Sequence, residues 1–505
     1  MRQCLPAPNA PLAAIDMGSN SFRLEIGRLS HGHYRRALYL KEAVRLGTGL
    51  DGDHRLSEAA MQLGLDCLRR FAEQLRGFTA LQVRAVATQT LREARNRDEF
   101  LSRAAVALGF PIEVISGREE ARLIYAGVAH LQPSTTPRLV IDIGGRSTEM
   151  ILGHGRVPVA AESFKVGSAS LSMRWFPHGR YTVEAFRGAQ IAAGAELEEA
   201  LHQFAPVYWR EALGASGTVG AVSQILQGAG ITDGRITPEA LRWCMAQCLA
   251  AGDARQLTLP SLREDRKPII GGGLALLYTL VTHFGIAELK PAMGALRQGV
   301  IIDLHERHAA RRGHGAGDMR DATVRELQVR FDVDAEQALR VRSLALCLLR
   351  SAWPDIDPER LRELAWAADL HEMGLMVSHH DHHRHGAYLM AQVDAPGFSQ
   401  SQQSRLGELL LAQRGGLRKL SPALQQPGFA WQALALRLAL IKCHARGEVD
   451  ETALKLRRDG AVARLGYSTK WASNHPRTLH WLREEAKAWT RLPALQLLLP
   501  QALSA

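Results

Sequence analysis

Apolar and polar positions alternate along residues 12–46 in three runs, LAAIDM, FRLEIGRL and YRRALYLKEAVRL, which the turns GSNS and SHGH separate. A period of two predicts β-strands, so we expect a three-stranded meander here. Ser57 then precedes a run with helical spacing that ends near residue 76, and Ser is a common N-cap. The pattern that follows predicts strands at 81–87 and 112–116 and helices at 91–108 and 118–130.

The strand–turn–strand pattern recurs near residue 138, where LVIDIGGRSTEMILG repeats the earlier AAIDMGSNSFRLEIG. A single shift superposes four pairs of residues: Asp16 and Asp142, Gly18 and Gly144, Ser21 and Ser147, and Gly27 and Gly153. Each copy continues with alternating helices and strands, including a predicted helix at 182–203. This layout predicts two related α/β lobes, at residues 12–133 and 134–306.

The character of the chain changes beyond about residue 306. The stretch RRGHGAGDM at 311–319 is typical of a linker, and residues 320 to about 490 show almost only helical periodicity, within a C-terminal domain expected at 320–505. We therefore expect an all-α C-terminal domain with a terminal extension. Residues 1–11 lack the apolar core of a secretory signal, and we interpret them as a disordered lead.

Composition restricts the possible classes of function more than it restricts the possible folds. The chain has 505 residues, of which 46% are hydrophobic and 22% charged, as in soluble globular proteins of several domains. No apolar run reaches the ~18 residues that span a bilayer, so no transmembrane segment is expected. Six scattered Cys residues and the absence of an export signal favour the cytoplasm. The net charge of +11 favours a polyanionic partner but leaves nucleic acid, membrane and phosphorylated substrates open.

Glycine and hydroxyl residues mark turns that suit phosphate. In both hairpin turns, glycine lets backbone N–H groups approach an anion, and hydroxyl side chains add hydrogen-bond donors. GASGT at 214–218 precedes an apolar helix. Gly271-Gly272-Gly273 is expected to open a helix at 274–284 in the same way, because helix N-termini attract anions. Ordinary strand–helix turns are the alternative. Four such turns in one α/β region favour two lobes that hold a phosphate between them.

Carboxylates accompany these turns. Asp16 and Asp142 end their strands, and Glu149 has the place in the second hairpin that Arg23 has in the first. A carboxylate that faces a phosphate is repelled unless it holds Mg²⁺ or acts as a base on water. Glu119 and Glu120 begin the helix after SGR, where the helix dipole alone also favours acidic residues. The local pattern leaves both explanations open for these two residues.

Several segments together resemble the exopolyphosphatase / guanosine pentaphosphate phosphatase family: IDMGSNSFRL, ATQTLREARNRDEFL, ISGREEARLIYAGV, LVIDIGGRSTEMILG, GASGT and GALRQGVI. The resemblance spans about residues 12–305 and implies the two-lobe, actin-like ATPase fold of the ribonuclease-H-like class, which sugar kinases, Hsp70 chaperones and actin share. The segment LHEMGLMVSHHDHHRHGAYLMAQVDAPGFSQ resembles the helical, HD-like C-terminal domain of the family's long members.

The resemblance also implies roles for single residues. It assigns to Glu120 the general base that activates water, with Glu119 as the lesser candidate. It assigns Mg²⁺ or the attacking water to Asp142 and Glu149, and a monovalent cation is a further candidate cofactor. The residues that it places along the phosphate cleft are Asp16, Gly18, Ser19, Asn20, Ser21, Arg92, Gly144, Gly145, Arg146, Ser147, Thr148, Ser216, Gly217 and Thr218.

Arg146 departs from the family's pattern, because the turn that usually reads GGGSTE reads GGRSTE here. If the position needs a positive φ, Arg costs about 1 kcal/mol relative to Gly. The corresponding residue of the first turn, Asn20, is not Gly either, which argues against this need. The guanidinium is expected either to clamp a phosphate or to crowd the substrate, and we favour retained activity over a degenerate site.

The C-terminal domain carries a His-rich stretch. HD hydrolases use a His-Asp pair, whereas this chain has His371-Glu372, followed by five more His residues between 379 and 385. The spacing of these five suits a transition metal. The resemblance favours a structural or polyanion-binding role over a second catalytic centre.

The leading functional prediction is an exopolyphosphatase, which uses Mg²⁺ to release terminal orthophosphate from inorganic polyphosphate. A long anion suits a basic protein. The alternatives are a 5′-phosphohydrolase of guanosine pentaphosphate (pppGpp) and a non-catalytic sensor of polyphosphate or guanosine tetraphosphate (ppGpp). Sugar and acetate kinases share the fold, but the EEAR and GGRSTE segments argue against them. The resemblance further implies a homodimer, and no nucleic-acid partner is expected.

Overall fold

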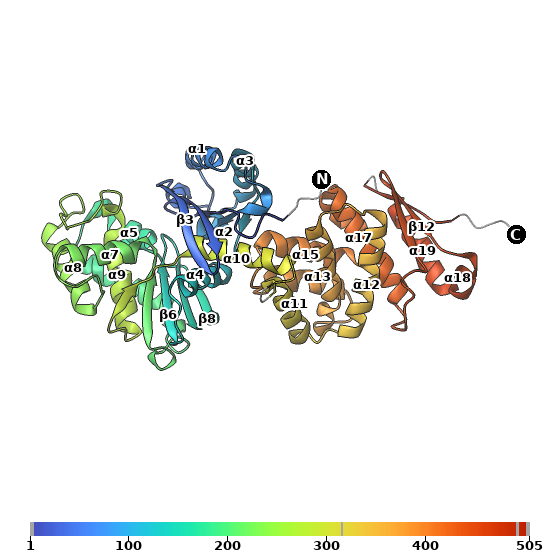
Figure 1. The fold of residues 1–505 in the computed structure, drawn as a ribbon. Coiled ribbons are helices and arrows are strands. Elements are labelled where there is room, and N and C mark those ends of the chain that lie inside the picture. Colours follow the sequence, from blue (N-terminus) through green and yellow to red (C-terminus); the bar gives the residue numbers. More distant parts are fainter. Residues whose placement is uncertain (1–4, 315–316, 491–493, 501–505) are drawn as a thin grey trace. The chain divides into compact units, whose positions relative to one another are not determined.

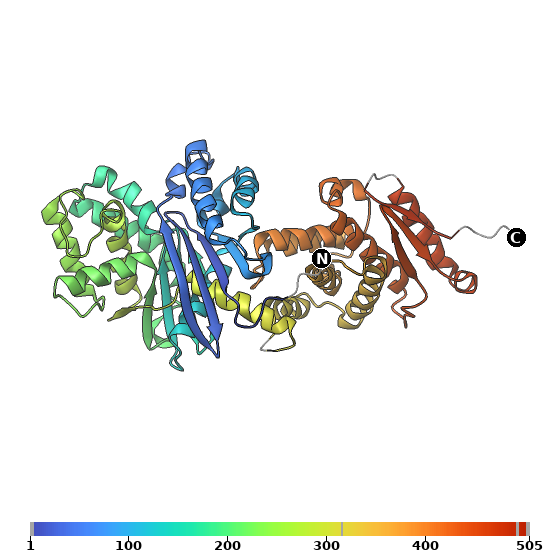
Figure 2. The same cartoon turned by 45° about the horizontal axis from the view of Figure 1, so that its top comes forward.

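The structure, a computed structural model, describes residues 5–314, 317–490 and 494–500. It forms two compact units, Leu5–Gly317 and the C-terminal residues that begin at Asp318 (Figure 1). The first unit consists of two lobes that follow each other along the chain, the first in blue and the second in teal and green (Figure 2). No helix among the described residues is long and apolar enough to cross a membrane.

The first lobe is built on a mixed five-stranded sheet of order β3-β2-β1-β4-β5. Its first three strands form the predicted meander, and β4 and β5 add in parallel. The expected helix at 91–108 is two helices, and Asn96, which lies between them, pairs through its side chain with the backbone of Leu56. The elements are β1 (Leu12–Met17), β2 (Phe22–Ser30), β3 (His33–Glu42), α1 (Glu58–Gln74), β4 (Val83–Ala87), α2 (Gln89–Glu93), α3 (Arg97–Leu108), β5 (Ile112–Val114) and α4 (Gly117–Leu131).

The second lobe repeats this topology with the order β10-β9-β6-β7-β8, in which β6 corresponds to β1 and β9 to β4. The β-bulge at Gly27 recurs at Gly153, and both glycines lie against a tyrosine ring where a Cβ has no room. The elements are β6 (Arg138–Ile143), β7 (Thr148–His154), β8 (Val157–Phe164), α5 (Ser168–Trp175), α6 (Val183–Leu197), β9 (Glu211–Ala215), α7 (Ser216–Gly228), α8 (Pro238–Ala251), α9 (Lys267–His283), β10 (Leu289–Pro291) and α10 (Leu296–Arg311).

Side chains that alternate along the central strands give each sheet two buried faces. Ala13 and Ile15 of β1 pack with α1 and α3, whereas Leu12 and Ala14 point to the opposite face. Val140 of β6 likewise faces away from the helices α6, α8 and α9. Helices α4 and α10 fill the space between these two inner faces (Figure 1), so that one core joins both lobes.

The two central helices cross at glycines. A Cβ on Gly127 of α4 would lie 2.5 Å from the Ala295 carbonyl oxygen, and a Cβ on Gly299 of α10 would overlap the Leu123 carbonyl oxygen. Backbone therefore touches backbone at this crossing, which only glycine permits. The crossing joins the middle of α4 to the first turn of α10.

A buried carboxylate, Asp303 of α10, ties three elements together. It accepts hydrogen bonds from Arg84 of β4 and Arg307 of its own helix, each at 2.7 Å, and from Arg122 of α4. Burial alone would raise the pKa of Asp303, but the guanidinium groups of Arg307, Arg122 and Arg84 lower it below its usual range. Because all four side chains are buried, removing one would leave uncompensated charge in the core.

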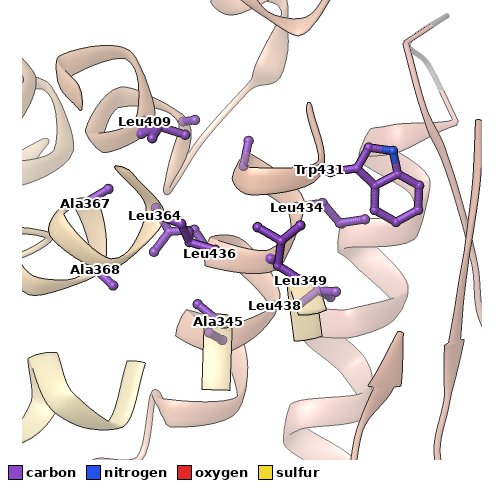
Figure 3. Close-up of a cluster of buried hydrophobic side chains, with 14 of the residues drawn as sticks. Ala345, Leu349, Leu364, Ala367, Ala368, Leu409, Trp431, Leu434, Leu436 and Leu438 are labelled. Carbon is purple, nitrogen blue, oxygen red and sulfur yellow. The ribbon is translucent and has the colours of Figure 1, made fainter. Parts of the chain in front are cut away.

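The C-terminal unit is mainly helical, and its core forms where α12, α13, α15 and α17 meet (Figure 3). Five leucines from these helices meet there: Leu349, Leu364, Leu409, Leu434 and Leu438. The helices are α11 (Met319–Arg330), α12 (Ala335–Ala352), α13 (Pro358–Asp369), α14 (His382–Gln392), α15 (Gln400–Ala412), α16 (Ser421–Leu424), α17 (Pro427–Cys443), α18 (Thr469–Asn474) and α19 (Pro476–Trp489).

The prediction that this unit is all-α is wrong in one respect, because it also contains a small sheet of order β11-β12-β13. In the hairpin, Leu456, Ala463 and Leu465 are buried, whereas Arg457, Arg458 and Arg464 are exposed, and Gly460 turns the chain with a φ of 60°. Period-two alternation over so few residues is easily missed beside long helices. The strands are β11 (Lys455–Asp459), β12 (Val462–Gly466) and β13 (Gln496–Leu498).

Three other expectations meet a different structure. The predicted second lobe, 134–306, ends inside α10, which packs against β1, β2 and α4. Gly271-Gly272-Gly273 does not open a helix but lies within α9, where a Cβ on Gly272 would come 2.5 Å from the Ser168 carbonyl oxygen of α5. These glycines serve helix packing rather than anion binding. Of the predicted lead, residues 1–4 lie outside the described residues, and residues 5–11 include a turn closed by a backbone hydrogen bond.

We expect Gly299→Ala to destabilise the first unit by about 3 kcal/mol or more, because the new methyl group meets a backbone carbonyl that cannot move aside. Thermal unfolding of the full chain measures this as a lower midpoint. Gly220→Ala in α7 is the matched control, since its Cβ meets nothing within 4 Å, and it should stabilise by about 0.5–1 kcal/mol. Equal midpoints for the two variants would contradict the close crossing.

Candidate active site

The two hairpins present the same positions to one cleft. Asp16 pairs with Arg23 across β1 and β2, and Asp142 pairs with Glu149 across β6 and β7, as the superposed sequences predict. In each lobe the strand carrying the Asp ends at the Gly/Ser turn, with a parallel strand beside it. The two turns and both carboxylates therefore lie at corresponding edges of the two sheets.

A cavity of about 310 Å³ lies between the lobes and brings most of the predicted residues together. Both turns contribute to its wall, as do the start of α7 and the N-terminal end of α10. The predicted residues along it are Asp16, Gly18, Ser19, Asn20, Ser21, Glu120, Asp142, Gly144, Gly145, Ser147, Glu149, Ser216, Gly217 and Thr218.

Three predicted residues are not among those that line the cavity. Thr148 is buried and donates a hydrogen bond to the Val166 carbonyl oxygen at 2.6 Å. Arg146 turns away from the cavity and pairs with Glu93 of the first lobe, Nη2 to Oε2 at 2.9 Å. Arg92 lies behind Glu120 rather than in the wall. The φ angle of Arg146 is not positive, so an Arg at this position carries no backbone strain.

Glu120 is placed in the wall by the start of α4, where the Ser116 side chain caps the helix. Arg92 Nη1 donates to Glu120 Oε2 at 2.8 Å, and both side chains are nearly buried. Burial raises the pKa of Glu120 to about 7, which Arg92 opposes and the charges of Asp16 and Asp142 reinforce. A carboxylate with a raised pKa at the wall of a cleft is suited to accept a proton from water.

The neighbouring Glu119 points elsewhere. Its carboxylate accepts two hydrogen bonds from Arg122, at 2.7 and 2.9 Å, and lies 3.7 Å from Arg84. It is 1% exposed and belongs to the ion cluster around Asp303. Adjacent residues on a helix point about 100° apart, so one carboxylate enters the core and the other enters the cleft.

Asp142 and Glu149 face Glu120 across the cleft. Burial raises the pKa of Asp142 to about 6, although Arg23 acts in the opposite direction. Burial and the charges of Glu120 and Asp142 raise the pKa of Glu149 well above its usual range, and Ser163 donates a hydrogen bond to it at 2.8 Å. This mutual repulsion is what a cation in the cleft would relieve.

Oxygen donors of this kind suit Mg²⁺, which keeps several waters and takes few protein ligands. The donor set therefore fits the ion in chemical type. Among the described residues, however, no group of three or more His, Cys, Asp or Glu side chains is arranged to hold an ion alone. Water and substrate oxygens would have to complete its coordination.

Sequence reasoning missed most of the positive charge in the cleft. The added basic residues of the wall are Arg23, Arg36, Lys41, Arg266 and Arg297. Burial and Arg266 lower the pKa of Lys41 to about 8. Arg36 and Lys41 lie on β3, the edge strand, whose charged positions look in sequence like an ordinary solvated face.

Neighbouring residues hold two of these basic groups, Arg266 and Arg297, in place. Gly217 leaves room for the Arg266 guanidinium, which a Cβ would overlap. Arg297 lies in the first turn of α10, where it pairs with Asp16 at 3.4 Å and Glu25 at 3.2 Å. Ser216 begins α7 with a φ of 85°, an unusual angle for a residue with a side chain, and its hydroxyl donates to the Ile143 carbonyl oxygen at 2.8 Å.

His371 and Glu372 of the C-terminal unit form structural contacts. His371 is buried, its Nδ1 lies 2.7 Å from the Ala368 carbonyl oxygen, and burial lowers its pKa to about 4. Glu372 pairs with Arg446. The described residues of this unit thus use the place of an HD dipeptide for packing and ion pairing.

Relatives with known names cover nearly the whole chain. Guanosine-5′-triphosphate,3′-diphosphate pyrophosphatase of Aeromonas hydrophila is 38% identical over 476 residues, which are 92% of this chain and 94% of that protein. The protein of the same name from Vibrio vulnificus is 36% identical over 490 residues, 96% of this chain and 97% of that one.

Solved structures share the fold of the first unit. An exopolyphosphatase from Cytophaga hutchinsonii matches 61% of this chain and 100% of its own, with a TM-score of 0.54 and 23% identity. The match confirms the two-lobe α/β architecture.

Family models agree with these relatives. The model of the Ppx/GppA phosphatase family matches residues 26–308, and that of Ppx/GppA phosphatase domain III matches residues 319–486. The chain therefore belongs to the Ppx/GppA phosphatase family, a family of hydrolases.

Proposed function

We propose that this protein hydrolyses the terminal 5′-phosphate of pppGpp and releases ppGpp and orthophosphate. The observation that carries the chemistry is Glu120, a nearly buried carboxylate with a raised pKa that faces two Gly/Ser turns and two further carboxylates in one cleft. The substrate rests on the named relatives, which are 35–38% identical over nearly the whole chain. The proposal thus replaces polyphosphate, the leading prediction from sequence, with its alternative.

In the proposed reaction, Glu120 takes a proton from a water molecule as the water oxygen forms a bond to the terminal phosphorus. The bond from that phosphorus to the bridging oxygen breaks, and the electron pair stays on the diphosphate. Phosphoryl transfer of this kind depends on positioning and on positive charge around the equatorial oxygens. Arg23 and Arg266 in the cavity wall would supply that charge.

Arg92 serves Glu120 rather than the substrate in this proposal. Its Nη1 also donates to the Ile115 carbonyl oxygen at 3.0 Å, which fixes the guanidinium against the start of α4. A general base must keep one lone pair directed at the water, and the bond from Arg92 to Oε2 leaves Oε1 for that task.

Mg²⁺ would be held by Asp142 and Glu149 together with water and phosphate oxygens. When bound, it would neutralise charge on the phosphates of the substrate. Ser163, which donates to Glu149 Oε1, would orient that carboxylate.

Polyphosphate remains a second candidate substrate for a specific reason. The cleft wall carries five basic side chains, and their charges suit the phosphates of polyphosphate as well as those of pppGpp. An HD-like character of the C-terminal unit, a homodimer and a cytoplasmic location stay predictions.

Glu120→Gln should lower kcat for phosphate release by roughly 10²–10⁴-fold, because an amide cannot accept the proton of water. Thermal unfolding should show nearly wild-type stability, because burial and the charges of Asp16 and Asp142 already raise the pKa of Glu120 despite Arg92, so a neutral side chain costs little there. Glu119→Gln, at the adjacent residue, is the matched control. It should keep the wild-type kcat but lose about 1.5–3 kcal/mol of stability, since Arg122 loses a charged partner. If Glu119→Gln were the inactive variant, the assignment of the base would be wrong.

Substrate preference is tested by kcat/KM for pppGpp and for polyphosphate with the same enzyme at the same salt concentration. We expect pppGpp to be favoured by about tenfold or more. Glu120→Gln must abolish both activities, which excludes a contaminating phosphatase. A preference for polyphosphate would restore the prediction made from sequence, and no release from either would favour a non-catalytic sensor.

Phosphate release is expected to stop in excess EDTA and to return with added Mg²⁺, because the carboxylates of the cleft repel a polyphosphate anion without a cation. Asp142→Asn should raise the Mg²⁺ concentration needed for half-maximal rate. Full turnover in EDTA would contradict the proposed role of the ion.

A further inference from the structure

Arg146 lies in the turn between β6 and β7 of the second lobe, yet its guanidinium is bound by the first lobe. Two of its nitrogens donate to Glu93 Oε2, Nη2 at 2.9 Å and Nε at 3.2 Å, and Nη1 lies 3.3 Å from the Gly47 carbonyl oxygen. The guanidinium is thus engaged three times across the lobe boundary. It is neither part of the cavity wall nor free to clamp a phosphate.

Glu93 belongs to α2, and a continuous set of hydrogen bonds runs from it to the proposed base. Gln89 Nε2 donates to the other oxygen of Glu93, Oε1, at 2.6 Å. Arg92 Nε donates to Gln89 Oε1 at 2.9 Å, and Arg92 Nη1 donates to Glu120 Oε2 at 2.8 Å. Four side chains therefore connect the turn of the second lobe to Glu120.

The surroundings favour a strong connection. The side chains of Arg146 and Glu93 are only 22% and 19% exposed, and those of Arg92 and Glu120 only 11% and 10%. Ion pairs that are shielded and held by more than one hydrogen bond are stronger and less screened by salt than exposed pairs. Gly47 also packs closely against the Arg146 side chain, where a Cβ would lie 2.9 Å from Cδ.

We propose that the Arg146–Glu93 pair is an interlobe clasp that positions Glu120 through Gln89 and Arg92. When the turn of the second lobe contacts the first lobe, Arg146 binds Glu93 and Glu93 orients Gln89. Gln89 in turn orients the guanidinium of Arg92, which directs the Glu120 carboxylate. Arg146 is then a positioning residue that acts from the opposite lobe. The link to catalysis rests on the proposed function, whereas the link between the lobes does not.

The test compares three kinds of variant in the full-length protein. Clasp variants are Arg146→Ala, Glu93→Gln and their double mutant. Gln89→Met breaks the connection inside the first lobe and leaves the clasp intact. Controls are Arg103→Ala and Glu58→Gln, which break a bidentate ion pair within the first lobe, at 2.6 and 2.8 Å, far from the cavity wall.

Two measurements are made on each variant. Hydrogen–deuterium exchange of backbone amides in the substrate-free protein, detected by mass spectrometry, reports how strongly residues 144–147 are protected from exchange. Initial rates of phosphate release give kcat and KM for the substrate that wild-type protein prefers. A merely local structural role would not let Glu93→Gln in one lobe change the exchange of residues 144–147 in the other.

We expect Arg146→Ala and Glu93→Gln each to speed exchange at 144–147 and to lower kcat on the order of tenfold, with KM little changed because neither side chain lines the cavity. The double mutant should be no worse than either single one. Arg146→Lys, which keeps the charge but loses the fork, should be intermediate. Gln89→Met should lower kcat by a similar factor but leave exchange at 144–147 unchanged. The control variants should match wild type in both kcat and exchange.

Unchanged exchange at 144–147 in Glu93→Gln would overturn the clasp. Additive losses in the double mutant would show that Arg146 and Glu93 act separately and would overturn the coupling. Full kcat in Gln89→Met would overturn the route to Glu120. Wild-type protein without phosphate release would instead refute the proposed function, and the exchange comparison would still decide whether the clasp joins the lobes.

Discussion

The structure depends on the contact between α4 and α10, where glycine backbones touch between the two sheets. Gly127 and Gly299 allow this approach, and the buried charges around Asp303 fix its direction. Because Glu120 begins α4 and Arg297 begins α10, the same contact brings a carboxylate and a guanidinium to the cleft from helices far apart in sequence. A small displacement of either helix would move both groups, since packed backbone has no side chain to absorb it.

The cleft itself is a balance of buried charges. Asp16, Glu120, Asp142 and Glu149 are held close to one another, and desolvation raises the pKa values of the last three. Arg23, Arg92 and Arg297 offset part of this repulsion from three different elements. Such an arrangement is costly unless the charge is neutralised, and the proposed entry of a cation together with the substrate would do this.

The duplication was predictable from sequence because both copies keep Asp, Gly and the flanking apolar residues in register, and the paired strands follow that register residue by residue. The cleft residues of the turns were found for the same reason. The role of Arg146 was not predictable, because its partner Glu93 is 53 residues away and lies in the other lobe. The Gly271-Gly272-Gly273 segment was misinterpreted because glycine in a turn and glycine in a helix contact look alike in sequence. The small sheet of the C-terminal unit was not predicted because its strands are too short to give a clear period-two pattern.

The central claim is that water, activated by Glu120, attacks the terminal phosphorus of pppGpp. Hydrolysis in ¹⁸O-labelled water tests it most directly, with both products analysed by mass spectrometry. The account predicts one label in the released orthophosphate and none in ppGpp. Label in the nucleotide product, or release of pyrophosphate, would contradict it.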